Sequence, residues 1–157
     1  MRVLGVDPGS RALGLSVLEQ DGAGVLRVLH REVLRPGEGD LMTRMTKIWA
    51  GLHRVLDLFP VDLVALEEGF QNTHARATDV LAKTRGLIMG AAIARQLPVR
   101  TYAPNVAKRV VCGYGAARKE QVQGAVRCLL GLEDMPASDE ADAMAVGLCA
   151  LLAGGRG

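Results

Sequence analysis

The sequence has few cysteines, no cluster of cysteine or histidine, and no long hydrophobic run. Its three cysteines, Cys112, Cys128 and Cys149, are far apart and set among aliphatic residues, so we expect buried thiols rather than a disulfide framework or a zinc site. The three histidines also lack metal-ligand spacing. The longest apolar run, residues 143–155, is shorter than the ~18–20 residues of a membrane span. No basic and apolar leader opens the chain. These absences predict a cytoplasmic protein that does not bind membranes.

The length and the composition are typical of one compact domain. The chain has 157 residues, of which 49% are hydrophobic and 23% charged, so neither disorder nor charge dominates it. A chain of this size buries roughly two thirds of its unfolded surface. We therefore expect a single domain over residues 1–157 that folds alone or as a dimer.

Positive charge gathers in the middle of the chain. Residues 74–127 hold ten Lys or Arg against two acids, a local charge of +8, whereas residues 1–73 carry −2 and residues 128–157 carry −4. A solvated helix face normally interleaves both signs. The pattern therefore favours a polyanion bound by a basic surface, and acids in the flanking segments that hold a cation.

Three β-like segments open the chain. "RVLGV" (residues 2–6) is a continuous apolar run that ends at the turn sequence "DPGS", as a buried central strand would. Residues 13–20 and 25–34 are joined by "DGAG", which indicates a hairpin. We expect these three strands to form a meander.

A helix follows, with Asp40 as its predicted cap and Pro60 as its stop. Trp49 is expected to pack with its apolar stripe. The stripe recurs every three or four residues and consists of Leu41, Met45, Ile48, Leu52, Val55 and Phe59.

The second half alternates strands and helices. We expect strands at residues 62–68 and 98–103, and helices at 75–96, 104–111, 118–131 and 139–153. Right-handed crossovers then give an α/β fold, a mixed five-stranded sheet of order 3-2-1-4-5 flanked by helices. Small residues at Gly86 and Gly90 would serve either the core or a subunit interface.

Acidic residues stand where the strand ends and the last helix should meet. Asp7 ends the first strand and Glu67 the fourth, and the carboxyl ends of neighbouring parallel strands form the ligand-binding rim of such sheets. Asp139 and Asp142 share one face of the last helix, while Glu140 points elsewhere. Each acid alone has an ordinary alternative as a cap, a turn residue or an exposed strand end. Their joint placement favours a common site.

Carboxylates at close quarters repel one another, so a cation is expected between them. Mg²⁺ suits a site made of oxygen ligands, and Mn²⁺ is the alternative. Four carboxylates would accommodate two ions roughly 3.5–4 Å apart, one that activates water and one that stabilises the leaving oxygen of a phosphoryl displacement.

Four segments together resemble the RuvC family of Holliday-junction resolvases, within the RNase H-like nucleases. They are "GVDPGSRALG" (5–14), "ALEEGF" (65–70), "KRVVCGYGAARKEQVQ" (108–123) and "SDEADAMAV" (138–146). The resemblance runs in order over nearly the whole chain, from about residue 3 to 152.

The resemblance implies an RNase H-like fold and a bacterial, nucleoid-associated homodimer that nicks two strands of like polarity in a four-way DNA junction. It also implies a branch-migration helicase complex as partner. Strand parity leaves open whether Glu67 or Glu68 faces the metal ions, and the family pattern selects Glu67. The implied metal-binding catalytic residues are Asp7, Glu67, Asp139 and Asp142.

Basic residues and one aromatic residue complete the predicted site. Lys108 and Lys119 match family positions near the scissile phosphate, and Lys119 also stands at a predicted helix start. Phe70 follows the glutamate pair, where it could stack on an unpaired base or fill the core. Further candidate contacts to the DNA backbone are Arg76, Lys83 and Arg85.

Three other functions compete with this interpretation. A related RNase H-like nuclease would cleave structured RNA, and a junction-binding module would lack catalysis, which the four carboxylates disfavour. "DPGS" also resembles the phosphate loop of actin-type ATP-binding proteins, but those need two such lobes and 157 residues hold one.

Overall fold

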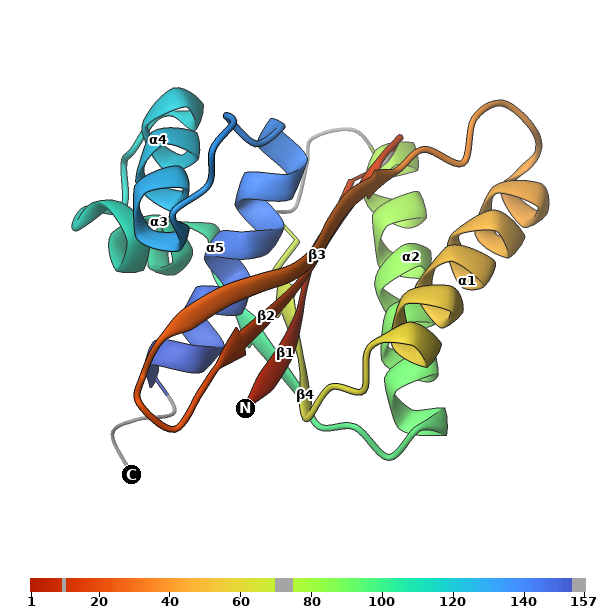
Figure 1. The fold of residues 1–157 in the computed structure, drawn as a ribbon. Helices are drawn as coiled ribbons and strands as arrows, with labels where there is room; N and C mark the ends of the chain where they lie inside the picture. Colours follow the sequence, from red (N-terminus) through yellow and green to blue (C-terminus); the bar gives the residue numbers. More distant parts are fainter. Residues whose placement is uncertain (10, 70–74, 154–157) are drawn as a thin grey trace.

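The computed structural model describes residues 1–9, 11–69 and 75–153, and it shows a central sheet with helices on both faces (Figure 1). The predicted strands and helices are all present, with ends within two residues of the predicted ones. The strands are β1 (Arg2–Pro8), β2 (Leu13–Gln20), β3 (Leu26–Leu34), β4 (Leu63–Glu67) and β5 (Val99–Tyr102). The helices are α1 (Leu41–Leu58), α2 (Ala75–Ala94), α3 (Pro104–Cys112), α4 (Lys119–Leu130) and α5 (Ser138–Ala153).

The strand order is β3-β2-β1-β4-β5, which confirms the predicted mixed sheet with a central first strand. β2 pairs antiparallel with both β1 and β3, so the predicted meander is also confirmed. β4 joins β1 in parallel, with Val6 opposite Leu66, and β5 runs parallel to β4. The carboxyl ends of β1 and β4 therefore lie side by side. We call this edge of the sheet, from Asp7 and Glu67 to the start of β2 at Leu13, the upper rim, since it is uppermost in Figure 1.

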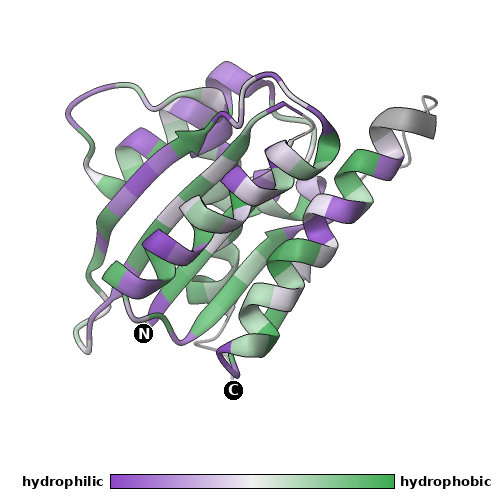
Figure 2. Ribbon diagram, turned by 90° about the vertical axis from the view of Figure 1, so that its right-hand side faces the viewer, coloured by the Kyte–Doolittle hydropathy of each residue, from purple (hydrophilic) through white to green (hydrophobic). Residues whose placement is uncertain are grey.

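Alternate residues of the central strands point into two separate hydrophobic cores. Leu4 and Val6 pack with α1 and α2, whereas Val3 packs on the other face with α3, α4 and α5. Figure 2 looks onto α1 and α2, with hydrophobic central strands behind them and a hydrophilic stretch on the edge strand β3. Among the described helices, none combines the length and the apolarity needed to span a membrane.

Helix α1 begins at Asp40 as predicted, where the carboxylate accepts a hydrogen bond from the Thr43 amide at 2.7 Å. The prediction that Trp49 packs with the apolar stripe is wrong. Trp49 is 39% exposed, and its ring lies against that of His53, with centroids 4.0 Å apart. It stands at the edge of the stripe, so its large indole reaches past the core to solvent.

The prediction of three buried thiols is right for Cys149 and wrong for Cys128. Cys149 is buried in α5, Cys112 is partly buried, Cys128 is exposed, and all three are free. Cys128 follows the buried Val126 by two residues on α4. Two helical residues turn the chain by about 200°, which puts Cys128 on the outer side of the helix.

Glycines allow α5 to lie directly on the backbone of the sheet. A Cβ atom added at Gly5 of β1 would overlap the carbonyl oxygen of Ala143, and one at Gly14 of β2 would overlap that of Asp139. On the helix, a Cβ atom at Gly147 would lie 2.9 Å from a leucine side chain of β2. At Gly5 and Gly14, where the neighbouring atom belongs to the backbone, only glycine fits. These glycines therefore set how near the start of α5 comes to the end of β1.

The close crossing predicts that replacing glycine by alanine has opposite effects on stability at two positions, Gly5 and Gly124. Gly5→Ala should lower the free energy of unfolding by about 2 kcal/mol or more, because overpacking against a backbone carbonyl is costly. Gly124→Ala on α4, where an added Cβ atom meets nothing within 4 Å, should raise it by about 0.5–1 kcal/mol. Urea unfolding measures both values. A Gly5→Ala protein as stable as the parent would contradict the packing described here.

Candidate active site

Strand parity places Asp7 and Glu67 on the α5 face of the sheet. Asp7 continues the alternation of Val3 and Gly5, which pack on that face, and Glu67 follows Ala65 in the same way. Both side chains are partly buried. Two carboxylates sixty residues apart in sequence thus point toward α5 from neighbouring strand ends.

Helix α5 carries two further carboxylates to the upper rim. The Asp139 carbonyl lies on Gly14, the residue that pairs with Asp7 across β1 and β2. Asp142 stands three residues further along, and both aspartates are partly buried. The close approach that the glycines permit therefore brings this helix face to the strand ends.

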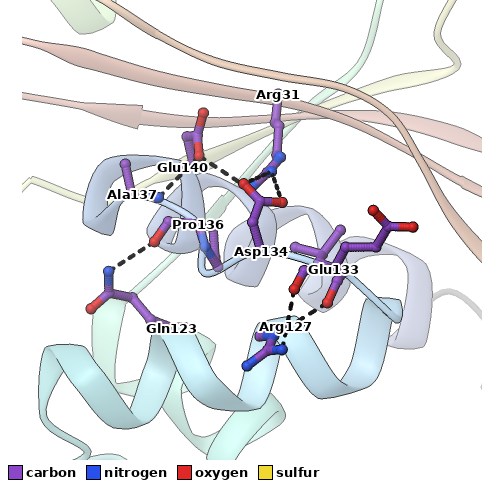
Figure 3. A network of polar contacts seen from close by, with 9 residues as sticks. Arg31, Gln123, Arg127, Glu133, Asp134, Pro136, Ala137 and Glu140 are labelled. Carbon is purple, nitrogen blue, oxygen red and sulfur yellow. Dashed lines mark hydrogen bonds and ion pairs between the residues drawn. The ribbon is translucent and has the colours of Figure 1, made fainter.

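Glu140 points away from the rim, as predicted, and serves the start of α5. Its carboxylate accepts a hydrogen bond from the Ala137 amide at 3.0 Å and pairs with Arg31 of β3 at 3.4 Å (Figure 3). The sequence left open that Asp139 or Ser138 caps this helix. Glu140 supplies the carboxylate at the helix start instead, and Asp139 is left to interact with Asp7.

A network of polar contacts holds the segment that leads into α5 (Figure 3). Arg31 bridges two acids, with Asp134 at 2.6 Å on one side and Glu140 on the other. Side chains of β3 and α4 thus both contact the connection between α4 and α5, and these contacts fix the first turn of α5. The contacts from α4 go to backbone carbonyls, Gln123 to that of Pro136 and Arg127 to those of Leu132 and Glu133.

Burial and repulsion between acids raise the pKa values of three carboxyls at the upper rim, those of Asp7, Glu67 and Asp142. Burial raises the pKa of Asp7 to about 7, and the charges of Asp142 and Asp139 add to the effect. Burial also raises the pKa of Glu67 to about 8, with further contributions from Asp7 and Asp142. The pKa of Asp142 is raised as well, chiefly by burial. Asp7, Glu67, Asp139 and Asp142 thus form one electrostatically coupled group, which we call the acidic cluster.

Two lysines, one from α3 and one from α4, counter this charge. Lys119, the first residue of α4, lowers the pKa of Asp7 and of Asp142. Lys108 of α3 lowers the pKa of Glu67 and of Asp142. Both lysines that the sequence placed near a phosphate therefore lie within electrostatic reach of the acidic cluster.

The structure separates the adjacent glutamates. Glu67 is coupled to Asp7 and Asp142 on the α5 face. Glu68 accepts a hydrogen bond from the Thr101 hydroxyl at 3.2 Å and is exposed. The register that the sequence could not decide is therefore set with Glu67 in the acidic cluster and Glu68 outside it.

The remaining predicted site residues differ in their distance from the acidic cluster and in whether the structure describes them. Arg85 of α2 faces inward, donates to the Glu67 carbonyl and lowers the pKa of that side chain, a supporting contact that the sequence did not indicate. Lys83 is exposed and pairs with Asp79 one turn earlier, at 2.6 Å. Phe70 and the side chain of Arg76 lie outside the described residues, so their predicted contacts with DNA stay predictions.

The donor chemistry of the acidic cluster fits a hard divalent cation. Its ligands would be carboxylate oxygens, and the raised pKa values of Asp7 and Glu67 mean that a negative charge on either is costly until positive charge is added. In the described part of the chain, no three Asp, Glu, His or Cys side chains already stand in an arrangement that could hold a metal ion.

Comparison with known proteins identifies a family. A family model described as "Crossover junction endodeoxyribonuclease RuvC" matches residues 3–150. A protein of that name from Syntrophomonas wolfei subsp. wolfei is 36% identical over 152 residues, which cover 96% of this chain and 88% of that one. Its counterpart from Geobacter sulfurreducens is 38% identical over 149 residues, with 95% and 91% covered.

Solved structures agree with the sequence comparison. The structure titled "T. thermophilus RuvC in complex with Holliday junction substrate" superposes with a TM-score of 0.89 at 36% identity, over 98% of this chain and 94% of that one. The yeast mitochondrial Holliday junction resolvase Ydc2 shares the fold, with a TM-score of 0.70 at 13% identity over 96% and 77%. With a family match over nearly the whole length and the acidic cluster at the upper rim, the chain belongs to the RuvC family of crossover junction endodeoxyribonucleases.

Proposed function

We propose that this chain resolves four-way DNA junctions in recombination and repair, by hydrolysing one phosphodiester in each of two strands of like polarity. The observation that carries the proposal is the acidic cluster, in which burial and mutual repulsion couple acids from β1, β4 and α5. Support also comes from the T. thermophilus relative, whose structure is titled as a complex with a Holliday junction substrate. Junction DNA is a polyanion, which suits the basic middle third of the chain.

Membership of this family implies that the chain needs a divalent metal ion. The residues that would hold it are those of the acidic cluster, and we infer Mg²⁺, with Mn²⁺ as an alternative and two ions per site. When bound, such ions neutralise the carboxylates, activate water and stabilise the charge that develops on the leaving oxygen.

The chain's own residues prepare this chemistry. Asp7 and Glu67 retain protons to an unusually high pH, so ion binding and proton release are coupled at these two carboxyls. Lys108 and Lys119 place positive charge on the side where a phosphate would approach. Arg85 holds the backbone carbonyl of Glu67 and so positions its side chain.

Three predicted DNA contacts extend this proposal beyond the acidic cluster. Phe70 would stack on an unpaired base at the junction centre. Arg76 and Lys83 would contact the DNA backbone from the helix that follows. Lys83 is exposed and forms a surface ion pair with Asp79, which is weak enough to exchange for a phosphate.

The proposed enzyme is a homodimer that joins through α2. A Cβ atom added at Gly86 or Gly90 would meet no atom of the described residues within 4 Å. These two glycines therefore do not pack in the core. Met89 and Ile93 lie on the same side of the helix and are 40% and 71% exposed. Two symmetric cuts require two sites, and an isologous contact through this small and apolar face would supply them. A branch-migration helicase complex is the proposed partner, in the cytoplasm of a bacterium and at its nucleoid.

Conservative replacements at the rim test the cleavage function. Asp7→Asn and Glu67→Gln should each reduce Mg²⁺-dependent nicking of a synthetic four-way junction by at least about 100-fold, because each removes a carboxylate from the acidic cluster. Glu68→Gln is the matched control and should retain activity within about threefold. Gel analysis of end-labelled strands measures the cuts, with a folded RNA as competing substrate. Loss of activity in Glu68→Gln alone, or cleavage of the RNA only, would overturn the proposal.

The raised pKa values predict an unusual pH dependence of stability. Unfolded carboxyls titrate near pH 4, whereas Asp7 and Glu67 keep their protons to about pH 7 and 8. The unfolded chain therefore loses protons first, and the metal-free protein should lose stability between about pH 4 and pH 8. We expect the melting temperature to fall by about 5 °C or more from pH 5 to pH 9.

Two comparisons test whether the carboxyls of the acidic cluster cause this pH dependence of stability. Asp7→Asn should flatten the profile, since it removes one of the shifted groups. Adding Mg²⁺ should raise the melting temperature more at pH 8 than at pH 5, because the ion competes with protons for the same oxygens. Scanning calorimetry measures each profile. A parent protein that gains stability steadily from pH 5 to pH 9 without metal would contradict the assigned coupling.

Charge introduced on the outer face of α2 tests the dimer. Gly90→Arg should raise the dimer dissociation constant by at least about tenfold, since it would bury a like charge from each subunit. The open space around Gly90 predicts that the subunit itself stays folded. Gly124→Arg, on α4 with equal room, should leave the dimer intact. Sedimentation velocity distinguishes these outcomes, and a parent protein that is monomeric at micromolar concentration would argue against the interface.

A further inference from the structure

A second basic site lies at the upper rim, outside the acidic cluster. It is a hollow of about 600 Å³ between the β1–β2 connection, the end of β3 and the first turns of α1. Its lining residues are mostly exposed, so it opens on the surface. The hollow is lined by Arg11, Arg35, Gly37, Glu38, Gly39 and Arg44.

The hollow and the acidic cluster share one rim but lie on opposite sides of the sheet. Leu13 pairs with Leu34, which brings Arg11 and Arg35 next to each other at the strand ends. Arg44 reaches the hollow from α1, which covers the face opposite α5. In Figure 1 the start of α5 and the β3–α1 connection stand at the same upper end, on either side of the strands.

Two of the arginines that line the hollow differ from several others on the described surface. Arg11 and Arg35 form no ion pair with any carboxylate in the part of the chain that the structure describes. Glu38 is the only acid among the lining residues, against three guanidinium groups. Five arginines elsewhere on the described surface do pair with carboxylates: Arg2, Arg27, Arg31, Arg54 and Arg95.

The loop beneath these arginines leaves its backbone accessible. Gly37 and Gly39 have φ angles of 72° and 136°, which favour glycine, and neither adds a side chain to the hollow. Lys47 adds charge at the edge, since its Nζ donates to the Pro36 carbonyl at 2.9 Å and lies 3.9 Å from the Cβ position of Gly37. The hollow is therefore positive, roomy and lined by donors.

We propose that this hollow binds backbone phosphates of a DNA arm on the far side of the upper rim from the cleavage site. Planar guanidinium groups from three separate elements suit the oxygens of a phosphodiester, which they hold by paired hydrogen bonds. A duplex that crosses the rim would meet the acidic cluster on one side and the arginine hollow on the other. The inference rests on the proposed function, because it takes DNA as the ligand.

Replacing the two unpaired arginines tests the site. Arg11→Gln combined with Arg35→Gln should weaken binding of a four-way junction by at least about tenfold near 0.1 M salt, measured by fluorescence anisotropy with EDTA present. The slope of log affinity against log salt should become shallower by about 1–2, since each phosphate contact contributes roughly 0.9. Glu38→Gln should act in the opposite direction and tighten binding about twofold to threefold. The pair Arg11→Lys and Arg35→Lys keeps the charge and should retain most of the salt slope.

A matched control removes the same charge at the other end of the sheet. Arg2→Gln combined with Arg27→Gln should change junction affinity by less than about twofold. If the Arg11 and Arg35 variant binds with unchanged affinity and slope while the parent cuts junctions, the hollow is wrong and the proposed function stands. A parent that binds DNA without cutting junctions would overturn the proposed function. The dependence of its DNA affinity on salt, compared with that of the Arg11 and Arg35 variant, would still test whether the hollow binds phosphates. Two results would overturn the hollow as a DNA site. One is a parent protein that binds no DNA. The other is protection of Arg11 and Arg35 from an arginine-directed reagent by millimolar inorganic phosphate but not by DNA.

Discussion

The acidic cluster depends on the contact between α5 and the backbone of β1 and β2. A helix that packs through ordinary side chains lies farther from a sheet, because those side chains fill the space between the two, and its short aspartates would then lie farther from the acids at the strand ends. Gly5 and Gly14 remove the side chains that would hold α5 away, and Gly147 does so from the helix. The contacts of Arg31 and Glu140 then fix the first turn. The long apolar run of α5 anchors the helix, and its acidic start is held at the rim.

Gathering the acids in this way costs free energy, and the surrounding charges limit that cost. Burial and repulsion raise the pKa of Glu67 to about 8, although Lys108 and Arg85 act in the opposite direction. The lysines come from α3 and α4, which pack with α5 on the face of the sheet toward which Asp7 and Glu67 point. The negative charges of the site therefore come from β1, β4 and α5, and the positive charges that oppose them come from α2, α3 and α4.

Much of this arrangement could be predicted from the sequence, because strand alternation and helix spacing are local properties. The order of the strands and the meeting of Asp7 with the acids of α5 followed from such patterns. The choice between Glu67 and Glu68 did not, since a shift of one residue turns a strand side chain to the other face. Trp49 was misplaced because a periodic stripe does not say how far a large ring at its edge extends. Glycines inside two strand patterns were a signal of close backbone approach that the sequence offered.

Helix α2 joins the site to the proposed dimer contact through two adjacent residues. Arg85 points inward and donates to the Glu67 carbonyl, whereas Gly86 points outward into open space. A rigid helix transmits a displacement from one of its sides to the other. A partner subunit that packs on Gly86 and Gly90 would therefore also affect the position of Arg85, and through it the position of Glu67. α2 packs on the sheet face opposite the acidic cluster, together with α1. The sheet therefore separates the face that gathers the carboxylates from the face that carries the proposed dimer contact, and the end of β4 connects the two.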